Sequence, residues 1–155
     1  MMVMTFKNAI KKDLPGQFQK GIQAVKKNDK AKFDVLNLSK VNGSVDIDKA
    51  FEQIDNNGNR WDYSIGYSNK AYFFEVHSMS SGTNIDEVIK KAQWLELFLK
   101  KATSIKSIKQ YPFCWIATDA GNQLRITQKS KQWKMLEKLH IEWDIQKVRK
   151  HFANI

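Results

Sequence analysis

The sequence predicts an α/β (α+β) domain with a small mixed central sheet flanked by helices. Residues 60–78 contain two extended stretches separated by a turn signal, and residues 111–118 form a second apolar run typical of a buried strand. Between them, residues 85–103 carry apolar side chains at helical spacing on a wide stripe. A helix with such a stripe covers one face of a sheet, which favours mixed α/β architecture.

Composition is consistent with one folded domain spanning residues 1–155. Hydrophobic residues make up 42% of the chain and charged residues 27%, which is typical of globular proteins. No internal repeat or linker divides the sequence, and no apolar run approaches the roughly 20 residues that a membrane helix needs. We therefore expect no association with a membrane.

The first third of the chain is predicted to be mainly helical. Its expected elements are a helix over 5–27 broken at Pro15-Gly16, a short strand or helical turn over 31–39, a loop at Asn42-Gly43-Ser44, a helix over 46–54 and a turn over 55–59.

The stretch from 60 to 78 predicts a β-hairpin. Large side chains such as Trp61 and Tyr63 alternate with small or polar ones, and Ser68-Asn69-Lys70 is a turn signal. The second strand, 71–77, is nearly all apolar, so we expect it to be central in the sheet.

Three polar residues of this hairpin are candidates for chemistry. Glu75 and His77 are two residues apart and share one face of their strand, and pairing about the turn brings Asp62 near Glu75. A carboxylate buried in an apolar strand needs a partner, a proton or a metal. Two structural explanations stay open: Asp62 is a solvated residue on an edge strand, or Glu75 and His77 pair with each other or with an arginine or lysine to satisfy a buried polar patch.

The remaining elements follow in order. They are a loop over 78–84, a helix over 85–103 capped by Thr83 or Asn84, a basic connector over 104–110, a strand over 111–118, a turn over 119–122 with a short strand over 123–127, and helices over 130–140 and 144–152.

The charge of the chain favours a polyanionic partner. The formal net charge is +10. Residues 100–134 contain eight basic side chains and a single acidic one, Asp119. Nucleic acid is the partner we expect, with contacts from Lys100, Lys101, Lys106, Lys109, Lys129, Lys131 and Lys134. The single Cys114 lies in an apolar run and no secretory signal is evident, so we expect a reducing, cytoplasmic location.

The order of elements, together with Asp62 and Glu75-Val76-His77, resembles the PD-(D/E)XK nuclease superfamily. Its signature is an aspartate on the second core strand and (D/E)-X-K on the third. The resemblance covers about residues 45–120, with basic helices over about 128–152 outside it, and it implies a restriction-endonuclease-like core. Where the family has lysine, this chain has His77.

The resemblance implies a Mg²⁺ or Mn²⁺ ion held by Asp62 and Glu75, with His77 assisting the attacking water. A lysine from another element, Lys49, Lys70 or Lys91, is a candidate to replace the motif lysine. Three functions stay open: a metal-dependent nuclease, a catalytically inactive relative that binds nucleic acid or a protein, and a small interaction protein for an acidic partner. The oligomeric state is not indicated.

Overall fold

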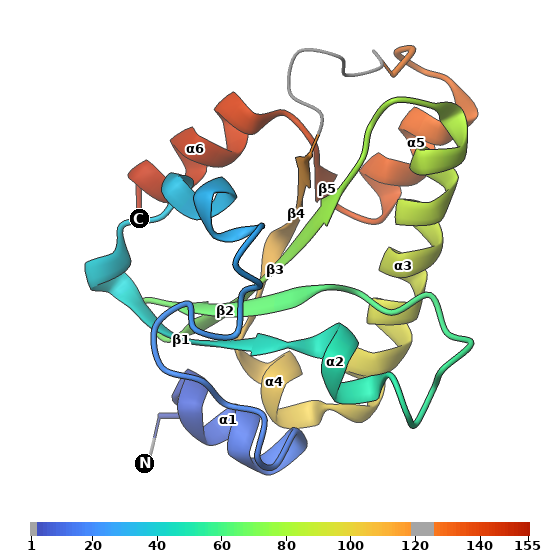
Figure 1. Ribbon diagram of the computed structural model, residues 1–155. Coiled ribbons are helices and arrows are strands. Elements are labelled where there is room, and N and C mark those ends of the chain that lie inside the picture. The colour runs from blue at the N-terminus through green and yellow to red at the C-terminus, as the bar shows by residue number, and fades with distance from the viewer. Residues whose placement is uncertain (1–2, 119–125) are drawn as a thin grey trace.

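The computed structural model describes residues 3–118 and 126–155, and the predicted fold class is confirmed. In the described residues one five-stranded mixed sheet, ordered β1-β2-β3-β4-β5, has helices on both faces (Figure 1). The strands are β1 (Val41–Asp46), β2 (Tyr63–Tyr67), β3 (Lys70–His77), β4 (Lys109–Ala117) and β5 (Ile141–Glu142). The α-helices are α1 (Phe6–Asp13), α2 (Ile47–Phe51), α3 (Gly82–Lys101), α4 (Thr103–Ile108), α5 (Lys131–Lys138) and α6 (Ile145–Ala153), and two short 3-10 helices are η1 (Lys30–Val35) and η2 (Leu38–Lys40).

The predicted hairpin is confirmed as β2 and β3. The two strands pair antiparallel from Tyr67↔Lys70 to Tyr63↔Phe74, so the turn contains only Ser68 and Asn69. Both turn residues have positive φ, +50° and +59°, as a type I′ turn requires. This turn fixes the register and so places Asp62 beside Glu75 at the open end of the hairpin.

Strand β3 is central, as its apolar sequence predicts. It pairs antiparallel with β2 and parallel with β4, and residues 71–75 are buried. A parallel pair needs a crossover, which α3 and α4 supply between the two strands. The last residues of β3 therefore lie at the opposite end of the sheet from α4.

Two apolar cores lie on the two faces of the sheet. One contains side chains of α1, α3 and α4 and includes Trp61 and Phe113. The other contains side chains of α6 and of the segment around η1, and includes Tyr63 and Phe152. Figure 1 shows α6 and the light-blue segment that contains η1 on one side of the strands and α3 on the other.

Helix α1 packs closely against β2. A side-chain carbon at Gly66 would overlap the ring of Phe6, which is fully buried. The missing Cβ of Gly66 lets the helix approach the sheet.

The helix predicted over 5–27 is wrong beyond Asp13, where α1 ends. Residues 17–27 instead form turns, because Gln19 makes an isolated antiparallel bridge with Ser44 in β1. The loop predicted at residues 42–44 is wrong for the same reason. Gly43 belongs to β1, with φ of +150°, and its lack of a side chain makes room for the Phe18 ring.

Of the two alternatives for residues 31–39, a short strand or a helical turn, the structure has the second, as 3-10 helices η1 and η2. Other boundaries differ: α2 is shorter than the predicted helix, so Ile54 is exposed. Helix α3 begins at Gly82 with Ser81 as N-cap, not Thr83 or Asn84. The predicted connector over 104–110 contains α4, whose Ile105 N–H donates to Asp13 Oδ2 at 2.8 Å.

In the C-terminal part, helices α5 and α6 match the predicted ones, with Ser130 and Asp144 as N-caps. Strand β5 was not predicted; it is two residues long and pairs with β4. The turn predicted over 119–122 and most of the strand over 123–127 lie outside the described residues. No helix in the described ranges combines the length and apolarity that crossing a bilayer requires.

Candidate active site at the end of β3

Asp62 and Glu75 clamp the two strands where their backbone pairing ends. Beyond the last pair, Tyr63↔Phe74, the Asp62 N–H donates to Glu75 Oε1 at 3.1 Å. The Val76 N–H donates to Asp62 Oδ2 at 3.0 Å. The carboxylates thus satisfy two backbone donors that the diverging strands leave without carbonyl partners.

Asp62 is also tied to α2. Its carbonyl oxygen accepts hydrogen bonds from the N–H groups of Ile47 at 2.9 Å and Asp48 at 3.4 Å. The Asp48 carboxylate pairs with Arg60 Nε at 2.9 Å. Residues 60 and 62, just before β2, are therefore fixed to the first turn of α2, which holds Asp62 in place.

Lys91 of α3 reaches both carboxylates. Its Nζ lies 3.3 Å from Asp62 Oδ1 and donates a short hydrogen bond to Glu75 Oε2. Glu75 is fully buried, and 19% of the side-chain surface is exposed at both Lys91 and Asp62. A helix that covers the sheet thus delivers one ammonium group to a pair of carboxylates from the hairpin.

The burial of this cluster shifts the pKa values of its members. Burial raises the pKa of Glu75 well above its usual 4.5, and the Asp62 charge raises it further, while Lys91 opposes both. Burial alone would lower the pKa of Lys91, but the charges of Glu75 and Asp62 outweigh it and raise that pKa. Lys91 is therefore a cation throughout the neutral pH range.

His77 lies between two acidic side chains. Its Nδ1 is 3.6 Å from Glu75 Oε2, and its Nε2 is 2.7 Å from Glu87 Oε2 of α3. The imidazole is partly accessible, with 23% of its surface exposed. When Nε2 carries the hydrogen and donates to Glu87, Nδ1 keeps a lone pair on the side of Glu75.

The structure brings together the three residues that the sequence singled out, Asp62, Glu75 and His77. Of the three lysines considered as replacements for the motif lysine, Lys91 alone contacts the carboxylates among the described residues. Lys70 begins β3 and so lies at the far end of the strand, and Lys49 is exposed on α2.

The expected nucleic-acid lysines divide into two groups. Lys109 lies opposite Ala71 at the start of β3, whereas Glu75 lies opposite Trp115 near its end. Four residues of β3, or about 13 Å, separate these positions. Lys100 and Lys101 end α3, and Lys106 lies in α4, at that same far end. Lys109 is also engaged, with Nζ 2.9 Å from the Tyr111 hydroxyl.

The other expected lysines are nearer the site. Gln132 of α5 donates to the carbonyl oxygen of Gly82 at 3.1 Å and to Asp86 at 2.9 Å, which places α5 beside the start of α3. Lys129, Lys131 and Lys134 are exposed there.

Sequence reasoning missed Glu87 as a member of the site. Glu87 and Lys91 are four residues apart and so share one side of α3. Lys91 stands three residues after Val88 and four before Leu95, both buried. A lysine at such a position in an apolar stripe needs an acidic partner across the interface, and that signal was available in the sequence.

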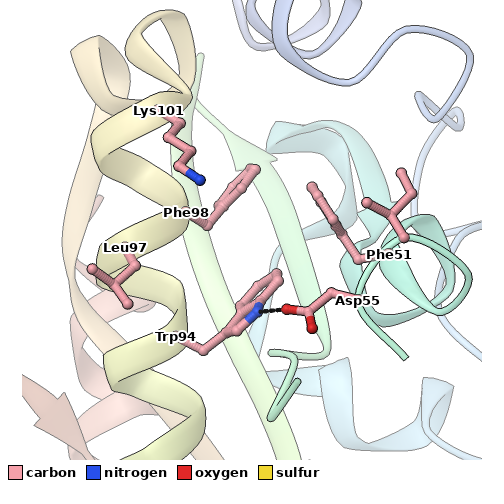
Figure 2. Close-up of a pocket in the computed structure, with 7 residues that line it drawn as sticks. Phe51, Asp55, Trp94, Leu97, Phe98 and Lys101 are labelled. Atoms are coloured by element: carbon pink, nitrogen blue, oxygen red, sulfur yellow. Dashed lines mark hydrogen bonds between the residues drawn. The ribbon is translucent and has the colours of Figure 1, made fainter. Parts of the chain in front are cut away.

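An aromatic pocket follows Lys91 along α3. Trp94 and Phe98 stack with their rings 7° from parallel, and Phe51 of α2 meets both edge-on (Figure 2). The indole N–H of Trp94 donates to Asp55 Oδ2 at 2.8 Å. These contacts fasten the segment after α2 onto α3.

Two carboxylates are the available ligands for a divalent metal. In residues 3–118 and 126–155 no group of three or more His, Cys, Asp and Glu side chains forms a metal centre. Asp62 Oδ1 and Glu75 Oε2 nevertheless face one cation, the Lys91 ammonium. One or two carboxylates with water and substrate phosphate are a usual ligand set for Mg²⁺, so this pair fits such an ion.

Comparison of the chain with protein-family models, with curated proteins and with solved structures finds no match.

Proposed function

We propose that this chain is a metal-dependent nuclease of the PD-(D/E)XK type that hydrolyses phosphodiester bonds in nucleic acid. One observation carries the proposal: Lys91 reaches Asp62 and Glu75 from α3, although the motif position itself holds His77. Two carboxylates and one lysine thus meet at the end of a hairpin, the set of groups that the superfamily uses.

Asp62 Oδ1 and Glu75 Oε2 would hold Mg²⁺ or Mn²⁺. The ion supplies a Lewis acid for the phosphate and lowers the pKa of a bound water. Lys91 occupies the space between the two oxygens in this structure and has a long flexible stem, so it moves aside by rotation about side-chain bonds. Its Nζ then donates to a non-bridging phosphate oxygen and offsets the charge that develops there.

His77 is the proposed general base. Hydrolysis forms a bond from the water oxygen to phosphorus and breaks the bond from phosphorus to the leaving sugar oxygen. His77 Nδ1 accepts the proton of the water, and the leaving oxygen takes a proton from solvent. Glu87 stabilises the imidazolium through its 2.7 Å contact with Nε2.

A catalytically inactive nucleic-acid-binding protein is the second candidate. The observation that favours it is that the four carboxylate oxygens of Asp62 and Glu75 already accept from backbone N–H groups or lie against Lys91. In that case Asp62, Glu75 and Lys91 form an ion cluster that stabilises the fold and has no catalytic role.

Cleavage assays separate the two candidates. The purified chain is incubated with supercoiled plasmid, single-stranded DNA and RNA in Mg²⁺ or Mn²⁺, beside Glu75→Gln and Lys91→Met. Cleavage by the wild type that both variants lose by about a hundredfold or more supports the nuclease. Binding without cleavage in either metal supports the inactive relative, and cleavage that survives in Glu75→Gln overturns the assignment of the site.

A further inference from the structure

A basic groove lies between the N-terminal segment and the first turn of α2. Its volume is about 610 Å³. Its charged lining consists of Lys26, Lys27, Lys30, Lys49 and Asp46. The side chains of Gln17, Gln19 and Gln23 add amide donors. None of these lysines belongs to the set expected from the sequence to contact nucleic acid.

The four lysines are exposed and available. In residues 3–118 and 126–155 none of them takes part in an ion pair. The single carboxylate of the lining, Asp46, is the N-cap of α2 and accepts from the Lys49 N–H at 2.9 Å. Four positive charges against one negative leave the lining with a net charge of +3. A polar groove with this charge fits an anion.

Both walls of the groove are fastened next to Asp62. On one wall, the Lys26 N–H donates to the Tyr63 hydroxyl at 3.2 Å, and that hydroxyl donates to Asp29 at 2.6 Å. On the other wall, the Ile47 N–H at the start of α2 donates to the Asp62 carbonyl oxygen at 2.9 Å. The groove walls therefore contact the Tyr63 side chain and the Asp62 backbone where the hairpin opens, while the carboxylates of Asp62 and Glu75 lie on the α3 face of the sheet.

A row of phosphates is the anion that this arrangement suits. The groove is lined by several lysines spread over two elements rather than by one cluster, and lysine contacts phosphate as a point charge without reading sequence. We propose that the groove binds the sugar–phosphate backbone of one nucleic acid strand and leads it to the Asp62–Glu75 site. This inference rests on the proposed function for the claim that the strand leads to a cleavage site at Asp62 and Glu75. The binding of the strand in the groove does not itself require cleavage.

The test compares two variants with equal loss of charge. The groove variant carries Lys26→Gln, Lys27→Gln, Lys30→Gln and Lys49→Gln. The control carries Lys11→Gln, Lys12→Gln, Lys147→Gln and Lys150→Gln, which are exposed on α1 and α6 and lie outside the groove lining. Affinity for a labelled single strand and for the matching duplex is measured over a range of salt concentrations.

The groove variant is expected to bind at least about tenfold more weakly than the control. The slope of log affinity against log salt should fall by about three, since each lysine–phosphate contact contributes roughly 0.7 to 0.9. Loss for the single strand alone identifies an unpaired strand as the occupant, and equal loss for both identifies one strand of a duplex. Equal weakening in the groove variant and the control overturns the inference, as does a wild type that binds neither nucleic acid.

The outcome is separable from that of the proposed nuclease. If the wild type cleaves and the groove variant binds like the control, the groove assignment fails and the nuclease stands. If the groove variant loses binding while the wild type cleaves nothing, the nuclease fails and the groove stands. If the groove assignment and the nuclease assignment are both correct, the groove variant should show a raised KM with little change in kcat. Its Mn²⁺ binding at Asp62 and Glu75 should be unchanged.

Discussion

Lys91 Nζ lies 3.3 Å from Asp62 Oδ1 although 29 residues separate the two in the chain. The contact joins α3 to the open end of the β2–β3 hairpin. Glu75 of β3 contacts the same ammonium group of Lys91. A buried carboxylate beside a second one needs a cation, a proton or a metal to offset its charge. The position of Lys91 on α3 is thus central both to the fold at this end of the sheet and to the proposed chemistry.

Replacing Lys91 with Met should destabilise the protein by about 3 kcal/mol near pH 8, because Glu75 remains buried without its cation. The free energy of unfolding, measured by chemical denaturation, checks this value. Lys90→Met is the matched control, because Lys90 is exposed on the same helix; its effect should be within about 0.5 kcal/mol. Equal effects of the two changes would show that the ion cluster contributes nothing to stability.

The stability of Lys91→Met should also depend on pH. The pKa of Glu75 is already above its unfolded value of 4.5, and loss of the Lys91 charge raises it further. The folded state then holds a proton that the unfolded state releases, so stability falls as pH rises from about 4.5 to the folded pKa. Thermal unfolding across this range should show a steeper fall than in the wild type. In Lys91→Met combined with Glu75→Gln the steeper fall should disappear; its persistence would contradict this origin.

His77→Ala should lower kcat about a hundredfold or more in the proposed nuclease, while stability changes little because the imidazole is partly exposed. A pH–rate profile supplies the diagnostic readout, since the limb that reports the base should vanish with His77. An unaltered profile in His77→Ala would exclude this residue as the base.

Gly66→Ala should destabilise the protein by about 1–3 kcal/mol, because the new methyl group overlaps the Phe6 ring and forces α1 from β2. Gly16→Ala is a useful comparison, because no atom lies near its would-be Cβ and only its φ of +81° opposes the change. Denaturation midpoints of the two variants check the prediction. A neutral Gly66→Ala would show that α1 does not sit against the sheet as described.

The hairpin and the central strand were predictable because their signals are local. Alternation over residues 61–67, a turn residue that tolerates positive φ and an apolar strand are enough to place Asp62 beside Glu75. The helix expected over 17–27 failed because the Gln19–Ser44 bridge is a tertiary contact between distant segments. The loop signal at Gly43 failed likewise, since that glycine accommodates Phe18 within a strand.

Within the site, the sequence supplied three candidate lysines and no means of choosing among them. The choice of Lys91 depends on how α3 is rotated over the sheet, which the apolar stripe sets only to within a residue or two. The lysines of the basic groove were missed because they come from two segments, around residues 26–30 and at 49, that meet only in the folded chain.

The most direct test of the proposed metal site is calorimetric titration of Mn²⁺ into the wild type, Glu75→Gln and Lys91→Met. Glu75→Gln keeps an oxygen to accept from the Asp62 N–H, so it removes charge with little change in shape. We predict one saturable site in the wild type, its loss in Glu75→Gln, and equal or tighter binding in Lys91→Met, where the competing ammonium is gone. Absence of binding to the wild type and to Lys91→Met at millimolar Mn²⁺, or undiminished binding to Glu75→Gln, would contradict the account.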